Sequence, residues 1–67
     1  MMTCFYLINR RTGWVRWVDK LEHLTNDRSF ALFTTDVVKV SKLVEKYVQE
    51  YKIYLVDKDG VVTKKYE

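Results

Sequence analysis

The sequence predicts an α+β fold, a mainly antiparallel five-stranded sheet in the chain order β-β-β-α-β-β with one amphipathic helix packed on one face. Three observations predict this class. Short runs of aromatic and β-branched residues are separated by turn-forming residues, as in antiparallel sheets. One central segment has apolar residues at helical spacing. With 67 residues and a hydrophobic content of 48%, the chain suits a single compact domain over residues 1–67.

The first two predicted strands are residues 4–8 (CFYLI) and 14–18 (WVRWV), joined by a turn that contains Gly13. A two-residue loop would require a positive φ at Thr12, which is unfavourable for a β-branched residue. A three-residue loop over residues 11–13 places only Gly13 in the left-handed region, so we expect this loop.

The loop sets the register of the hairpin and decides which side chains share a face of the sheet. The predicted cross-strand pairs are Arg10 with Trp14, Ile8 with Arg16, and Tyr6 with Val18. The predicted core face, on which the helix should pack, carries Phe5, Leu7, Asn9, Val15 and Trp17. The opposite face carries Tyr6, Ile8, Arg10, Trp14, Arg16 and Val18. Because unpaired arginines are costly in a core, we expect this second face to meet solvent or a partner.

The middle of the chain is predicted to contain a loop and a third strand. Residues 19–28 are polar apart from Leu21 and Leu24 and favour a loop, with room for one helical turn. Residues 29–34 (SFALFT) predict the third strand. Thr35 is then the expected N-cap of the helix, with Asp36 in the first turn, where a carboxylate suits the helix dipole.

Residues 36–51 have the pattern of an amphipathic helix, with lysines mostly opposite the apolar stripe. The apolar positions at steps of three and four are Val37, Val40, Val44, Tyr47 and Tyr51. Residues 52–57 (KIYLVD) and 61–66 (VVTKKY) predict the fourth and fifth strands, joined by a turn at 58–60.

The DKDG run at 57–60 suggests a calcium loop but does not fit one. If Asp57 and Asp59 were the third and fifth residues of an EF-hand loop, Leu55 would be the first residue and Tyr66 the twelfth. Both of those positions need a carboxylate. The Asp-Gly pair favours a hairpin turn instead. The only cysteine, Cys4, and the only histidine, His23, exclude an internal disulfide and a zinc site of the usual ligands. We therefore expect no metal and no cofactor.

No catalytic motif is recognisable. His23 stands near Asp19 and Glu22, but the chain has no nucleophile motif and, with two glycines, no phosphate-binding loop. A short chain also leaves little room for a deep pocket. We therefore expect a protein without enzymatic activity. The apolar run at 1–8 has no basic residue before it and is too short for a membrane span, so neither a signal peptide nor a span is expected. Because small secreted domains usually need disulfides or metal sites, a cytoplasmic location is expected.

The stretch NRRTGWVRW at 9–17 brings together three arginines and both tryptophans. Tryptophan, tyrosine and arginine are enriched where binding energy concentrates in protein interfaces. The expected binding surface comprises Tyr6, Ile8, Arg10, Arg11, Trp14 and Arg16, while Trp17 is expected to anchor the core. Two alternatives remain open. The loop at 19–28 could cover this face through Leu21 and Leu24, or two copies of the chain could bury it between them as a homodimer.

The segments YLINRRTGW and FALFTTD resemble small uncharacterised accessory proteins of phages and prophages of Gram-positive bacteria. Those proteins open with a similar strand and Thr-Gly turn, followed by a strand that ends Ala-Leu-Phe before an amphipathic helix. The resemblance implies binding and blocking of a bacterial host protein, including CRISPR or restriction nucleases. Inhibitors that mimic DNA are strongly acidic, whereas this chain has a net charge of +3, so a contact through apolar groups and arginines fits better.

The leading hypothesis is a small protein-binding module, with inhibition of a host protein as its expected role. The alternative is a single-stranded nucleic-acid-binding protein that uses the same face, since aromatic rings can stack on bases while arginines contact phosphates. Binding driven by phosphates weakens steeply with salt, whereas an aromatic protein interface is much less sensitive. No membrane partner is expected.

Overall fold

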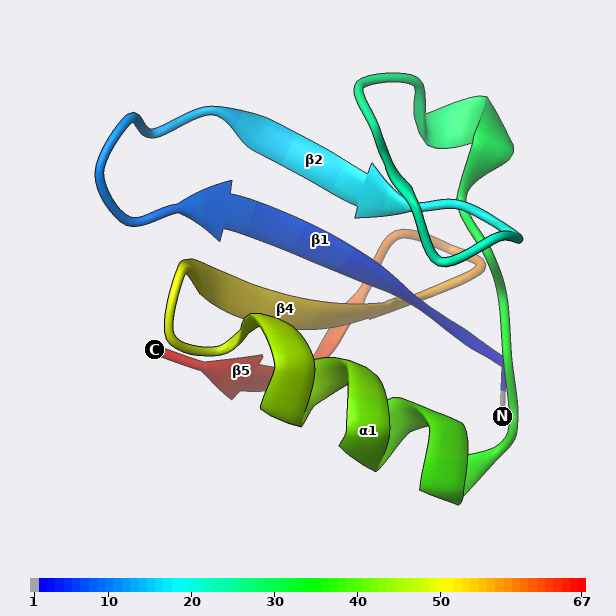
Figure 1. Cartoon of the computed structure of the whole chain (residues 1–67). Helices are drawn as coiled ribbons and strands as arrows, with labels where there is room; N and C mark the ends of the chain where they lie inside the picture. Colours follow the sequence, from blue (N-terminus) through cyan, green and yellow to red (C-terminus); the bar gives the residue numbers. More distant parts are fainter. Residues whose placement is uncertain (1) are drawn as a thin grey trace.

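The computed structural model describes residues 2–67 as one antiparallel sheet with a helix across one face (Figure 1). The elements in chain order are β1 (Thr3–Asn9), β2 (Val15–Val18), β3 (Leu24–Thr25), the 3-10 turn η1 (Arg28–Phe30), α1 (Val37–Tyr47), β4 (Tyr51–Asp57) and β5 (Val62–Tyr66). The five strands lie in the order β3-β2-β1-β4-β5, and every neighbouring pair is antiparallel. The predicted fold class and chain order are confirmed.

The helix α1 begins one residue later than predicted. Asp36, and not Thr35, is the N-cap, because its carboxylate accepts hydrogen bonds from the backbone N–H groups of Val38 and Lys39. The helix ends at Tyr47, and residues 48–50 form the turn into β4. Within residues 2–67, no helix has the length and apolar character needed to cross a membrane.

A first hydrophobic cluster fills the space between α1 and the sheet. Its buried members are Phe5, Leu7, Val18, Leu43, Val44, Tyr51, Ile53 and Leu55. Leu24 and Tyr47 are among the half-buried residues that pack at its edge. Alternation along β1 and β4 directs Phe5 and Ile53 to this side and their chain neighbours to the other.

A second, smaller cluster lies on the opposite face of the sheet. Its buried members are Cys4, Trp17 and Val56, with Tyr6, Ala31, Phe33 and Tyr54 packed around them. Cys4 is fully buried and packs as a small apolar side chain. Both faces of the sheet therefore carry apolar packing, although only one of them carries the helix.

The prediction of a third strand over residues 29–34 is wrong. Asp27 accepts hydrogen bonds from both the backbone N–H and the hydroxyl of Ser29, and this cap starts the turn η1. The chain then crosses the end of the sheet through single bridges at Ala31 and Thr34. The third strand is instead β3, inside the segment predicted as a loop, because Leu24–Thr25 pairs with the end of β2.

The predicted register of the first hairpin is also wrong, by one residue. Tyr6 pairs with Trp17 and Ile8 pairs with Val15. The loop has four residues, 10–13, because the N–H of Asn9 donates to the carbonyl of Trp14. The Asn9 side chain stabilises this longer loop, because its Oδ1 accepts hydrogen bonds from the backbone N–H groups of Arg11 and Thr12.

This shift reverses the predicted faces of β2, since side chains alternate with a period of two. Trp17 and Val15 lie on the face away from the helix, whereas Trp14, Arg16 and Val18 lie on the helix side. Trp17 is still buried, as expected for an anchoring residue, but in the second cluster.

The turn between β4 and β5 is the predicted hairpin. The Asp57 carboxylate accepts hydrogen bonds from the N–H groups of Asp59 and Val61, and the N–H of Gly60 donates to the carbonyl of Asp57. Gly60 has a φ of 84°, which glycine adopts without strain. The Asp57 carboxylate therefore orders the turn itself.

Candidate functional site

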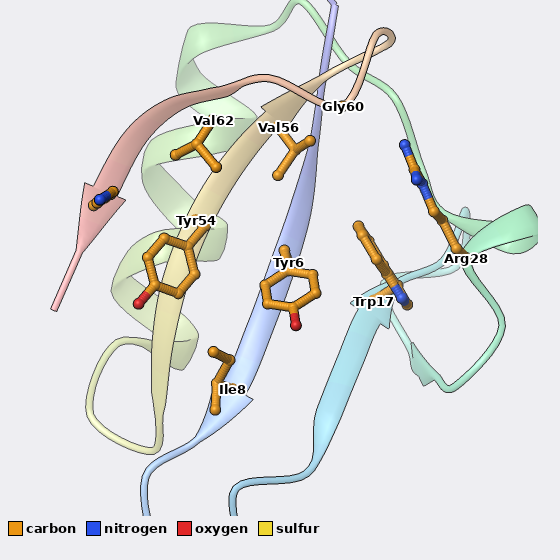
Figure 2. A pocket seen from close by; sticks show the side chains of 9 residues that line it. Tyr6, Ile8, Trp17, Arg28, Tyr54, Val56, Gly60 and Val62 are labelled. Atoms are coloured by element: carbon orange, nitrogen blue, oxygen red, sulfur yellow. The ribbon is translucent and has the colours of Figure 1, made fainter.

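The face of the sheet opposite α1 contains an open groove of about 480 Å³, called the open-face groove below (Figure 2). Its lining residues are Tyr6, Ile8, Trp17, Arg28, Tyr54, Val56, Gly60, Val62 and Lys65. They come from β2, β1, β4 and β5, from the β4–β5 turn and from the start of η1, so the groove crosses the strands. Figure 2 shows the helix behind the sheet and the labelled side chains in front of it.

Three aromatic rings form the middle of the groove. The register places Tyr6 between Trp17 and Tyr54, in one row across three strands. The Tyr6 ring lies 5.0 Å from the Trp17 ring and 5.9 Å from the Tyr54 ring, with interplanar angles of 76° and 58°. These inclined contacts are the favourable arrangements for aromatic pairs, so the rings hold one another in place.

Arg28 forms one end of the groove. Its guanidinium lies 5.5 Å from the centre of the Trp17 ring, a cation–π distance, and Trp17 is 8% exposed. The turn η1, capped by Asp27, positions Arg28 there. Hydrogen bonds from Ser29 lower the pKa of Asp27, so the cap stays ionised under ordinary conditions.

The side chain at position 28 also lies beside the glycine of the β4–β5 turn. A Cβ atom at Gly60 would stand 3.8 Å from a terminal nitrogen of Arg28. The turn therefore passes close to the guanidinium without blocking it.

Lys65 forms the other end of the groove, on β5. It pairs with Tyr54, whose hydroxyl donates a hydrogen bond of 3.0 Å to the Glu67 carboxylate and has a raised pKa because of it. In the part of the chain from Met2 onward, the only ion pair joins Lys39 to Glu22. Arg28 and Lys65 therefore have no carboxylate partner among the described residues.

Only two of the six predicted site residues lie in the open-face groove. Tyr6 and Ile8 line the open-face groove. Trp14 and Arg16 lie on the other face of β2, where the Arg16 guanidinium stacks 5.1 Å from the Trp14 ring. Trp14 is 63% exposed. The predicted common surface of tyrosine, tryptophan and arginine on one face is therefore not formed as expected.

The two arginines of the loop have separate positions. Arg10 donates a hydrogen bond from Nε to the carbonyl of Val48, the C-cap of α1, so it links the hairpin loop to the helix end. Arg11 is exposed in the turn, away from the groove lining.

Most residues of the groove are not among the predicted site residues. The missed lining residues are Trp17, Arg28, Tyr54, Val56, Gly60, Val62 and Lys65. Asn9 at the start of the turn was the available indication of the longer loop, and hence of the face of Trp17. Tyr54 could only be placed beside Tyr6 by knowing that β4 pairs with β1.

The groups considered for catalysis do not form a reactive constellation. The backbone of His23 is hydrogen-bonded to Asp19, and the residue is exposed in a turn. Burial raises the pKa of the Cys4 thiol, so it is protonated and poorly nucleophilic at neutral pH. Among residues 2–67, no group of three His, Cys, Asp or Glu side chains is placed to hold a metal ion.

No protein-family model, no curated protein and no solved structure matches the chain.

Proposed function

We propose that the protein is a non-enzymatic protein-binding module that holds a segment of its partner in the open-face groove. The observation that carries this proposal is the lining of the groove, where tyrosine, tryptophan and aliphatic side chains are combined with an arginine on a face that the helix leaves uncovered. Aromatic residues and arginine are the groups that dominate binding energy in protein interfaces.

The geometry of the aromatic rings favours a protein over a single-stranded nucleic acid. Bases stack on the exposed faces of separate aromatic rings. In this groove the Tyr6 ring packs obliquely against both neighbours, and the face of Trp17 is occupied by the Arg28 guanidinium. Inclined rings around Ile8 and Val62 form apolar walls that suit aliphatic side chains.

A binding module of this kind acts by occupying a surface of its partner. The resemblance to phage and prophage proteins makes a bacterial host protein, such as a CRISPR or restriction nuclease, the proposed target of inhibition. The cations of the groove suit an acidic region of that target, whereas a mimic of DNA would itself be acidic.

The test is an unbiased peptide-display selection on the immobilised protein, followed by affinity measurements on two matched variants. Val62 lines the groove and is 43% exposed, while its neighbour Val61 is 57% exposed and is not part of the lining. Val62→Gln places a polar side chain in the groove, and Val61→Gln makes the same change beside it. We expect Val62→Gln to weaken the selected peptides about tenfold or more and Val61→Gln to leave them unchanged.

Equal affinity of the selected peptides for both variants would refute the groove as the binding site. Tight binding of oligothymidine or oligouridine that weakens steeply between low and high salt would favour the nucleic-acid alternative.

A further inference from the structure

The open-face groove has an apolar middle and a cation at each end. Arg28 lies over Trp17 of β2, and Lys65 lies on β5. The Glu67 carboxylate is held by the Tyr54 hydroxyl and lies beyond ion-pair distance of Lys65 in the described structure. Two cations without acidic partners beside a hydrophobic surface are complementary to a ligand with two anionic groups and an apolar group between them.

The sheet sets the spacing between Trp17, over which the Arg28 guanidinium lies, and Lys65. The strands β2, β1, β4 and β5 are consecutive neighbours, and Tyr6 and Tyr54 lie in one row between Trp17 and Lys65, so Trp17 and Lys65 are three strand spacings apart. At about 4.8 Å per spacing, this separation is about 14 Å. An extended peptide that lies across the strands advances about 3.3 Å per residue and covers this distance in about four residues.

The same periodicity decides which side chains of such a peptide face the groove. In an extended chain, residues i, i+2 and i+4 point to the same side. A carboxylate at i can meet Arg28 while a carboxylate at i+4 meets Lys65, and the side chain at i+2 then lies over the rings of Tyr6 and Tyr54. The planar guanidinium of Arg28, already oriented by Trp17, suits a bidentate carboxylate contact.

We infer that the open-face groove binds an extended acidic segment of a protein partner, with carboxylates four residues apart and an apolar residue midway between them. This inference rests on the proposed function and names the chemistry of the partner. The chain itself does not supply such a segment, because no two of its 9 acidic residues are four positions apart. The occupant is therefore another protein and not a second copy of this chain.

The test uses Trp17 as a fluorescent reporter of the groove. The chain has two tryptophans, and Trp14 lies on the opposite face of β2, so Trp14→Phe leaves Trp17 as the only tryptophan. The probe is a capped seven-residue peptide with aspartate at its second and sixth positions, leucine at the fourth and serine elsewhere. In one control peptide the two aspartates are two positions apart, and in the other control both aspartates are replaced by lysine. We expect the four-residue spacing to bind about tenfold more tightly than either control, because each control loses at least one of the two charged contacts.

Charge reversal in the protein provides a second measurement. Lys65→Glu, at an exposed site, should weaken the acidic probe about tenfold, and Arg28→Glu together with Lys65→Glu should make the protein prefer the lysine peptide. Lys20→Glu with Lys42→Glu makes the same net change of charge outside the groove lining and should leave both affinities nearly unchanged. Circular dichroism of each variant confirms that it is folded.

Absence of binding by the acidic probe at millimolar concentration, or equal affinity for all spacings, would overturn this inference. If Val62→Gln still removes the binding of selected peptides of another composition, the protein-binding function stands and only the acidic occupant is wrong. If Val62→Gln changes the binding of no peptide, the proposed function itself fails.

Discussion

Trp17 in β2 and Trp14, just before the start of β2, stand three residues apart, point to opposite faces of the sheet and have different surroundings. Trp17 is 8% exposed and packs against Tyr6, Cys4 and Val56 beneath the Arg28 guanidinium. Trp14 stacks with Arg16 but is mostly exposed. The difference in burial means that the same truncation has different consequences at the two positions.

Trp17→Ala should lower the free energy of unfolding by about 3–5 kcal/mol, as expected for removing a large buried aromatic side chain. Trp14→Ala should change it by about 1 kcal/mol or less. Chemical denaturation followed by circular dichroism measures both values. A larger loss for Trp14→Ala than for Trp17→Ala would contradict the observed register.

The Cys4 thiol should be unreactive in the folded protein. It is fully buried, and burial raises its pKa above the ordinary value, so the thiolate needed for reaction is scarce at neutral pH. We expect a thiol reagent such as dithionitrobenzoate to modify Cys4 completely in concentrated urea and only slowly without it. Rapid stoichiometric modification under native conditions would show that the second cluster opens readily.

At the scale of elements, the turn between β2 and β3 contains the only non-glycine residue with a positive φ in the described chain, Glu22 at 61°. The Tyr47 hydroxyl donates a 2.9 Å hydrogen bond to its carbonyl, and Lys39 forms an ion pair with its carboxylate at 3.7 Å. These two contacts link the turn to α1 and hold a backbone conformation that is unfavourable for most residues.

Replacing Glu22 by glycine and by alanine separates this backbone effect from the ion pair. Both changes remove the carboxylate, but only glycine adopts a positive φ at little cost. Glu22→Gly should therefore be about 1 kcal/mol more stable than Glu22→Ala, as measured by thermal or urea denaturation. The opposite order would indicate that the turn does not hold this conformation in solution.

The elements that the sequence predicts best are those specified by local chemistry. The helix follows from apolar spacing and from an acidic cap, although the cap is Asp36 and not Thr35. The β4–β5 hairpin follows from its Asp-Gly turn. In these cases the residues that decide the structure are close together in the chain.

The register of the first hairpin shows where local reasoning fails. The steric preference of Thr12 predicts a three-residue loop. In the structure the loop has four residues, because the Asn9 side chain accepts hydrogen bonds from two backbone N–H groups and stabilises the longer loop. A one-residue change reverses the face of every side chain on β2. The groove was therefore unpredictable in detail, since its residues from four strands and η1 meet only through sheet pairing.

At the scale of the whole molecule, the sheet is packed on both faces by different means. The helix covers one face, while the segment from Arg28 to Thr34 covers only one end of the other through Ala31 and Phe33. The remainder of that second face is the open-face groove. The alternative in which Leu21 and Leu24 cover this face is not formed, because Leu21 is 68% exposed and Leu24 packs on the helix side.

The central strands connect the two clusters. On β1, Phe5 belongs to the first cluster and Cys4 to the second, and on β4 the same holds for Leu55 and Val56. Unfolding of either strand would therefore disrupt the packing of both clusters. We therefore expect both clusters to unfold in a single cooperative transition, as small domains usually do.

This prediction can be tested with the Trp14→Phe variant, in which Trp17 fluorescence reports only on the second cluster and far-ultraviolet circular dichroism reports on α1 and the sheet. In urea the two signals should give the same midpoint and the same slope, because a two-state transition has no populated intermediate. A lower urea midpoint for fluorescence than for circular dichroism would mean that the groove side unfolds while the helix side remains folded. That result would also make the groove a less ordered surface than its packed aromatic rings imply, and its binding would then include the cost of ordering those rings.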